Sequence, residues 1–389
     1  MRSGFRVARL FGINIYIDWS WIFIFLLVTW NLAGVVFPQI YPQMDFGTVL
    51  ALSVGASLLF FASVLVHELA HSLMAKARGL PVRRITLFIF GGVSNIEREP
   101  PSPATEFFVT IVGPISSLLL GILFIYLGAQ NMETIAIPTL QAFGQLEPLS
   151  TLFLWLGSIN ILLAAFNMIP GFPLDGGRIL RSIIWAISGN LRWSTRIATW
   201  VGQAVAWLFI LTGIAMVFGF QVPIFGTGLV GGLWLAFIGW FLNMAASQSY
   251  QQVVVADMLE GVPVARLMRT DPPMVDPQTR ISGLIDKHIM GTDERAFPVL
   301  EHDRLVGLIC LDDVRKVPRS EWDETLVQEV MTPADELVTI SPRTDSNDAF
   351  QKLSQKDVRQ MPVIENGQLV GMLRRRDIMR FLQLQSDSF

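Results

Sequence analysis

Few charged residues, little histidine and a single cysteine set the first bounds on this chain of 389 residues. Only 16% of the residues are charged and 52% are hydrophobic, which excludes an ordinary soluble protein and indicates one whose partner is the lipid bilayer. The formal net charge of −3 gives no basis for a nucleic-acid partner, and none is expected. Cys310 stands alone, so an internal disulfide is excluded.

Two of the four histidines fall in one pentapeptide, His67-Glu-Leu-Ala-His71, inside an almost uninterrupted apolar run at 49–74. On a helix these histidines are one turn apart on one face, so both can bind one Zn²⁺, with Glu68 beside them as a general base. In a soluble helix the same pattern is often a chance surface match. Inside hydrocarbon such side chains are costly unless they are paired or ligated, which favours a metal site.

Six apolar stretches are long enough to span a bilayer, which needs about 20 helical residues. They cover residues 19–38, 49–75, 105–128, 150–187, 198–220 and 224–245. Lysine and arginine are absent from residues 39–48, 129–149 and 219–223, but are frequent after the second and fourth stretches and in the C-terminal third. The charges assigned to the loop that follows the fourth stretch are Arg178 and Arg181, near the end of that stretch, and Arg192 and Arg196 beyond it. This alternation predicts a multi-pass protein of the cell membrane with both termini in the cytoplasm.

Residues 84–97, between the second and third apolar stretches, have the pattern of two short strands around Gly91-Gly92 as a turn or bulge. A plain hairpin is one interpretation. The segment begins a few residues beyond His71, so the alternative is an open strand edge that holds an extended peptide by β-addition. In that case Gly91 and Gly92 are candidate substrate-contacting residues.

A second motif, Asn167-Met-Ile-Pro170-Gly-Phe-Pro173-Leu-Asp175-Gly-Gly177, interrupts the fourth apolar stretch. Its two prolines and paired glycines cannot continue a helix, so we expect the helix to open here and line a site. Asp175 is then the natural third zinc ligand, with the fourth position open for water. Its alternative role is to cap a helix that starts at Gly176. Two neutral imidazoles, Asp175 and Glu68 balance the charge of Zn²⁺, which favours burial.

Two asparagines, Asn160 and Asn167, lie seven residues apart and hence on one helical face. Their amides are candidates to donate to a developing oxyanion. They are also explained as polar contacts between helices, an interpretation that suits Asn160 better than Asn167. Three other carboxylates have simpler explanations as solvated or interfacial residues, namely Asp18, Glu97 and Glu99.

The composition turns polar from about residue 246, which predicts a separate soluble region. Within it, Pro298 to Val314 recurs as Pro362 to Ile378 at an offset of about 64 residues, with equal internal spacings. Each copy has the pattern of a helix, two short strands and a closing helix, and each is too small to bury a core alone, so the two should pack together. The expected domains are a transmembrane domain at 1–245, a linker at 246–260, and repeat units at 261–320 and 321–389.

The two membrane motifs resemble those of the site-2 protease family of intramembrane zinc metalloproteases. His67-Glu-Leu-Ala-His71 matches the family's HExxH, residues 167–177 match its NxxPxxPLDGG, and Gly113-Pro114 is similar to a further family element. The resemblance implies one Zn²⁺ per chain, with Glu68 as the catalytic residue. The implied zinc ligands are His67, His71 and Asp175. It also implies an endopeptidase that cleaves transmembrane segments of membrane-bound regulatory proteins.

The soluble repeat resembles a pair of cystathionine β-synthase (CBS) domains, which implies control by an adenine nucleotide. The family's nucleotide motif is similar to Gly-x-x-Ser/Thr-x-x-Asp. This chain keeps Asp313 and Asp377 as candidates to hold ribose hydroxyls, but has Cys310 and Arg374 at the two hydroxyl positions. The alternative is that the pair only forms a homodimer or docks the cytoplasmic tail of a substrate.

These patterns predict a polytopic α-helical membrane protein with six transmembrane helices and a small β-hairpin edge element, followed by a C-terminal α/β tandem CBS domain. A CBS-gated membrane transporter or channel is the alternative function, because a broken helix with polar residues at the bilayer midplane suits either class. The two functions differ in their need for Glu68, since a channel has no use for a base that generates hydroxide.

Overall fold

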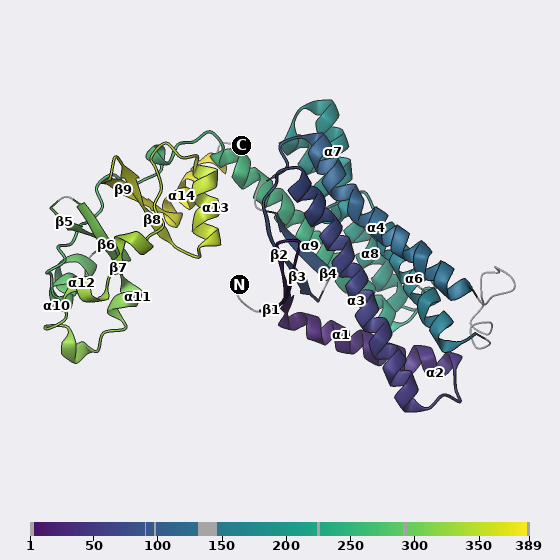
Figure 1. The fold of residues 1–389 in the computed structure, drawn as a ribbon. Coiled ribbons are helices and arrows are strands. Elements are labelled where there is room, and N and C mark those ends of the chain that lie inside the picture. The colour runs from purple at the N-terminus through teal and green to yellow at the C-terminus, as the bar shows by residue number, and fades with distance from the viewer. Residues whose placement is uncertain are drawn as a thin grey trace. The chain divides into compact units, whose positions relative to one another are not determined.

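The computed structural model describes residues 4–89, 91–96, 99–130, 146–223, 226–290, 292, 294–302 and 304–386. The chain divides into two compact units, Met1–Gln251 and Gln252–Phe389, which are drawn in Figure 1. Helix α9 (Leu229–Leu259) contains the boundary between them and also most of the expected linker.

Six helices in the described part of the chain are long and apolar enough to cross a membrane, which confirms the predicted number of spans. The first combines α1 (Trp19–Asn31), a π-helical turn (Leu32–Val36) and α2 (Phe37–Ile40). The others are α3 (Phe46–Ala77), α4 (Pro103–Ala129), α6 (Pro148–Asn167), α8 (Leu191–Val217) and α9. Large apolar side chains such as Trp30, Leu119 and Trp207 are exposed on these helices, as a surface that faces lipid requires.

The predicted opening of the fourth apolar stretch is confirmed. Helix α6 ends at Asn167, residues 168–174 are irregular, and α7 (Asp175–Ser188) begins after them. The two prolines of the motif lie in this irregular segment because neither can continue the hydrogen-bond ladder of α6. Arg181, which the charge pattern counts as a loop residue, lies instead in α7 and is buried.

A four-stranded sheet with the order β1-β2-β3-β4 accompanies the helices. Its strands are β1 (Gly4–Leu10), β2 (Ile13–Asp18), β3 (Val82–Phe88) and β4 (Gly91–Ile96). The predicted hairpin is present as β3 and β4, but Gly91 and Gly92 form the start of β4 rather than the turn. Strands β1 and β2 were not predicted, and β2 pairs with β3 in parallel across more than 60 residues of chain.

Strand β4 is the last strand of the described sheet on its side and packs against α3. Alternate residues of β4 face the helix. Ser94 contacts Glu68 and Ser72, and Ile96 packs with Ala75 of the same helix. The strand therefore runs along the helix that carries the HExxH motif, and its backbone edge is not paired with another described strand.

The second unit contains two copies of the same supersecondary structure. Strand β5 (Ala296–Glu301) pairs with β6 (Arg304–Cys310) in the register that β8 (Gln360–Glu365) and β9 (Gln368–Arg374) repeat, including a bulge at the equivalent position. The remaining elements are α10 (Ile281–Leu284), α11 (Leu311–Val314), α12 (Val327–Val330), β7 (Thr332–Pro333), α13 (Ser346–Gln355) and α14 (Arg375–Ser386).

The two copies pack together, as their small size predicts. Ala296 and Leu308 of the first copy form a buried cluster with Met372 of the second. The backbone of Arg269 also exchanges two hydrogen bonds with that of Met372, so the beginning of the first copy pairs with β9 of the second. Each copy therefore buries apolar surface of the other.

Candidate metal centre

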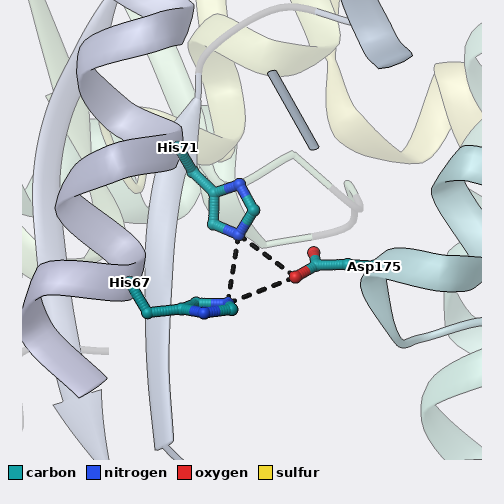
Figure 2. Close-up of side chains that lie close together, drawn as sticks. All are labelled: His67, His71 and Asp175. Carbon is teal, nitrogen blue, oxygen red and sulfur yellow. Dashed lines mark hydrogen bonds and ion pairs between the residues drawn. The ribbon is translucent and has the colours of Figure 1, made fainter. Parts of the chain in front are cut away.

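Three side chains that are far apart in the sequence converge between α3 and the start of α7, as Figure 2 shows. His67 and His71 lie one turn apart on α3, and Asp175 is the first residue of α7. The Nε2 atoms of the two histidines are 3.2 Å apart, and each is 3.2 Å from Oδ2 of Asp175. Within the described ranges this is the only group of three or more His, Cys, Asp or Glu side chains spaced to hold a metal ion.

The spacing of these donor atoms fits a tetrahedral zinc ion. Ligand atoms about 2.0–2.1 Å from such an ion lie roughly 3.3 Å from one another, and all three distances here are 3.2 Å. Three donors at this spacing form one face of a tetrahedron and leave the fourth position open. An open fourth position is typical of catalytic zinc sites, whereas structural sites use four protein ligands.

Helix α4 orients both imidazole rings. Nδ1 of His71 donates to the carbonyl oxygen of Val109 at 2.8 Å, and Nδ1 of His67 lies 2.9 Å from Oγ of Ser117. Because a carbonyl oxygen only accepts, His71 carries a proton on Nδ1, which leaves the lone pair of Nε2 free to bind a metal. A partner on the second ring nitrogen is the usual arrangement of metal-binding histidines.

Gly113 lies on α4 beside the two imidazoles. A Cβ atom at this position would overlap Nε2 of His71 and would lie 2.9 Å from Nε2 of His67. Only glycine therefore lets α4 approach α3 at the level of the histidines. Pro114 follows inside the same helix, so the Gly113-Pro114 element found in the sequence lies at this centre.

The carboxylate of Asp175 is directed at the histidines and does not cap its own helix. The structure places Leu174 at the N-cap of α7 and Asp175 in the first turn. Both ion pairs of Asp175 are with the two histidine rings, and its side chain is 16% exposed. The alternative role of Asp175, as the cap of a helix that starts at Gly176, does not describe this geometry.

Glu68 is half-buried and is held by strand β4. Oγ of Ser94 donates to Oε2 of Glu68 at 2.7 Å, and Ser72 donates to Ser94 at 3.1 Å. A Cβ atom on Gly92 would overlap Cγ of Glu68, so this glycine makes room for the side chain. Glu68 is thus the residue through which the HExxH helix contacts the strand edge.

The two asparagines proposed for an oxyanion role make hydrogen bonds in their own surroundings. Nδ2 of Asn160 donates to Oγ of Ser63 at 3.3 Å and to the carbonyl oxygen of Leu156 at 2.8 Å. Nδ2 of Asn167 donates to the carbonyl oxygen of Leu163 at 3.0 Å. Asn160 therefore joins α6 to α3 as a polar contact between helices, while Asn167 ends α6 where the chain opens.

Two of the other carboxylates near the membrane motifs have separate partners. Asp18 accepts from the backbone N–H of Ser20 and caps α1. Glu99 pairs with Arg181 of α7. Neither belongs to the group formed by the two histidines and Asp175. Glu97 lies outside the described residues.

Three residues that orient the histidines and Glu68 were not predicted from the sequence. Val109 acts through its backbone carbonyl, so its side chain carries no signal. Ser117 lies four residues after Gly113 and thus on the same face of α4, which is a signal that could have identified it. Ser94 alternates with Gly92 on one face of β4, and that period-2 pattern would have paired the two.

The profile of peptidase family M50 matches residues 55–212, and that of the CBS domain matches residues 264–320 and 327–384. A Synechocystis sp. protein named "Putative zinc metalloprotease sll0528" is 34% identical over 386 residues, 98% of this chain and 96% of that one. "Zinc metalloprotease MJ0392" of Methanocaldococcus jannaschii is 28% identical over 384 residues, 99% of this chain and 97% of that one.

The site-2 protease from Methanocaldococcus jannaschii is 27% identical, with 64% of this chain and 95% of that chain covered and a TM-score of 0.41.

The site combines three donor atoms spaced for zinc with a neighbouring glutamate, in a chain whose helices are apolar enough to cross a membrane. These features define the protein as a membrane metalloprotease. The chain belongs to peptidase family M50, the site-2 proteases, and carries a tandem pair of CBS domains. Membership implies Zn²⁺ as the cofactor and substrates embedded in the membrane. The alternative of a CBS-gated transporter or channel is set aside on the same findings.

The two aspartates predicted to hold ribose already have partners within the chain. Oδ2 of Asp313 accepts from the backbone N–H of Cys310 at 3.1 Å, and Oδ1 accepts from Lys316 at 2.8 Å. Asp377 accepts two hydrogen bonds from the guanidinium of Arg374, at 2.6 and 2.7 Å. Both oxygens of Asp377 are therefore bound to Arg374, and each keeps a further lone pair.

A cavity of about 1530 Å³ lies in the CBS pair and is strongly basic. Seven arginines and three carboxylates line it, and the arginines are Arg295, Arg315, Arg359, Arg374, Arg375, Arg376 and Arg380. Glu294 is buried there, and its Oε1 accepts from Arg374 at 2.5 Å and from Arg376 at 2.7 Å. Burial and the nearby carboxylate of Asp313 raise the pKa of the Cys310 thiol to about 11, so this lining thiol stays protonated at neutral pH.

Proposed function

We propose that this metalloprotease cleaves the transmembrane segments of membrane-bound regulatory proteins, with His67, His71 and Asp175 as its zinc ligands and Glu68 as its base. The observation that carries the proposal is the position of the two histidines along α3, a helix long and apolar enough to cross a membrane. His71 and His67 precede Ala77, the last residue of α3, by about 9 and 15 Å of helix at 1.5 Å per residue. A hydrolytic centre at that depth serves peptide bonds that also lie in the membrane.

Bound zinc would supply a Lewis acid that lowers the pKa of water and polarises the scissile carbonyl. The two histidines and Asp175 would hold the ion, and the Nδ1 partners on α4 keep both rings aligned. Glu68 takes a proton from the attacking water and later gives it to the leaving amide nitrogen. Asn167, which stands where α6 opens, remains a candidate donor to the oxyanion, and Asn160 a weaker one.

A membrane substrate has to be unwound before it can be cut, because a helical carbonyl is already hydrogen-bonded and shielded. We propose that the edge of β4, including Gly91 and Gly92, holds the unwound segment by strand addition. Support comes from the unpaired edge of β4 in the described sheet and from the contact of Gly92 and Ser94 with Glu68. A segment added there would lie close to the base.

For regulation, we propose that the basic cavity of the CBS pair takes an anionic ligand, for which an adenine nucleotide is the candidate. Its arginines suit phosphate groups. Asp313 and Asp377 follow two of its lining residues, Cys310 and Arg374, by three positions in the sequence. Homodimerisation through the CBS domains is a further proposal. The distribution of Lys and Arg supports placing both termini in the cytoplasm.

The function is tested with the purified protein co-reconstituted in vesicles with a set of single-span membrane proteins. We expect at least one of them to be cut inside its apolar span, as mapped by mass spectrometry of the fragments. Removal of zinc with 1,10-phenanthroline should stop the reaction, and added Zn²⁺ should restore it, because the metal supplies the Lewis acid. Cuts confined to the water-exposed tails, or cleavage that survives the chelator, would contradict the proposal.

Replacing Ser94 with alanine should lower kcat by about 10- to 100-fold, since a hydrogen bond to a charged group is worth about 1.5–3 kcal/mol. The lost bond is the one from Oγ of Ser94 to Oε2 of Glu68. Zinc content should not change, because no zinc ligand contacts Ser94. Ser158→Ala is the matched control, since Ser158 donates only to a carbonyl of its own helix. If the Ser94→Ala enzyme is as fast as the Ser158→Ala enzyme, Ser94 does not support Glu68 in catalysis.

A further inference from the structure

Two charged side chains that are deeply buried in the described part of the membrane unit, Arg181 and Glu106, do not belong to the catalytic set. Arg181 of α7 is 2% exposed, and its guanidinium forms two hydrogen bonds with Oε1 of Glu106 on α4, which is 0% exposed. Its Nη2 also reaches Glu99 at 3.0 Å. Ionisable groups at such positions are costly in a membrane protein and are presumed to serve function.

A buried ion pair is weak evidence for stability, because apolar side chains of the same volume often stabilise a fold equally well. What such a pair does provide is a fixed geometry, since either charge left alone is strongly unfavourable. Oε2 of Glu106 has no hydrogen-bond partner among the described residues, so the position of this carboxylate does not give it the largest possible number of hydrogen bonds. The arrangement of the ion pair therefore favours a role in aligning the two helices that it joins, α4 and α7.

The position of Glu106 on α4 shows which residues the ion pair aligns with one another. Glu106, Val109, Gly113 and Ser117 follow one another at intervals of three, four and four residues, so they share one face of the helix. Val109 and Ser117 orient the two zinc-binding histidines, and Gly113 lies against both rings. The fourth residue of this face, Glu106, binds the helix that begins with Asp175.

Arg181 also contacts the irregular segment that leads into Asp175. Its guanidinium lies 5.3 Å from the ring centroid of Phe172, which is itself buried. The pair therefore fixes α7 relative to α4 and restrains the segment three residues ahead of the third ligand.

We infer that the Arg181–Glu106 ion pair is a positioning element of the metal centre, which sets Asp175 at ligand distance from histidines that the same face of α4 orients. The inference rests on the proposed zinc ligands. Neither residue touches the metal, so both act only through Asp175.

The test uses full-length protein in nanodiscs with the variants Arg181→Lys and Glu106→Gln. Lysine keeps the charge but loses the two-pronged geometry of the guanidinium, and glutamine keeps the shape but loses the charge. Arg178→Lys, one turn earlier on α7, is the matched control. The readouts are the zinc Kd from chelator competition and the visible absorption spectrum of the Co²⁺-substituted protein, which reports ligand number and geometry.

We expect both variants to raise the zinc Kd by about 10- to 100-fold, as is usual for residues that orient a ligand. Their Co²⁺ spectra should shift toward that of Asp175→Ala, and adding Arg181→Lys to Asp175→Ala should weaken binding no further. Folded variants with the wild-type Kd and spectrum would overturn the inference. Loss of the fold in both variants would overturn it too, because the pair would then hold the helix packing as a whole.

Failure of this inference can be told apart from failure of the proposed function. If the wild-type protein does not bind one equivalent of zinc, the proposed centre itself is wrong. If the wild type binds zinc and the two variants bind it equally well, only the positioning role is wrong.

Discussion

Replacing Glu68 with glutamine is expected to lower the rate of peptide cleavage by about 10²–10⁴-fold, the usual contribution of a general acid–base group. Zinc should remain bound, because the three donor atoms belong to His67, His71 and Asp175. The glutamine side chain has the same shape and can still accept from Ser94, so the fold should be preserved. The measurement pairs a cleavage assay on a co-reconstituted membrane substrate with the zinc content of the same preparation.

The outcome separates two explanations of the HExxH motif. A Glu68→Gln enzyme that keeps zinc and loses activity has lost a base and not a structural residue. A Glu68→Gln enzyme that cleaves at the wild-type rate would show that the proton is taken by another group, and the mechanism proposed above would be wrong.

Replacing Gly113 with alanine is expected to weaken zinc binding by about 100-fold or more, at the upper end of what residues around a metal site contribute. The added methyl group would overlap Nε2 of His71 and crowd Nε2 of His67, so one of the two rings has to move. Activity should fall with zinc occupancy. Equilibrium dialysis against buffered zinc provides the measurement.

Gly55→Ala is the matched control for this variant. Gly55 lies on α3, the helix that carries both histidines, and a Cβ atom there meets no other atom within 4 Å. It should bind zinc as the wild type does and be slightly more stable, because alanine favours a helix by about 1 kcal/mol over glycine. Equal zinc affinity in the two alanine variants would mean that α4 does not approach the histidines as described.

The sequence predicted the parts of this molecule that depend on short-range pattern. Apolar length predicted six membrane helices, and the two prolines of the Asp175 motif predicted the opening between α6 and α7. The repeat with its offset of 64 residues predicted two equal hairpins, and their identical registers agree with it. In each case the signal is the spacing of residues within one element.

What the sequence could not predict depends on contacts between distant elements. Strand β2 carries isoleucine at positions 13, 15 and 17, which is a local strand signal that was overlooked. Its parallel partner β3 lies about 70 residues further along the chain, so the pairing itself has no local signal. Gly92 was expected at a turn because glycine is common there. In the structure, the side chain of Glu68 occupies the space that a Cβ atom on residue 92 would need, and this contact explains the glycine. Arg181 was assigned to a loop by its charge, and only its partner Glu106 explains its burial.

The central claim is that two motifs more than a hundred residues apart form one zinc site, and metal analysis of the wild type against Asp175→Ala tests it most directly. Both proteins are purified in parallel, dialysed against the same buffered zinc and measured for zinc per chain. We predict one zinc per wild-type chain and a large loss in the variant, because two histidines alone do not make a stable site. Equal zinc in the two proteins would contradict the claim.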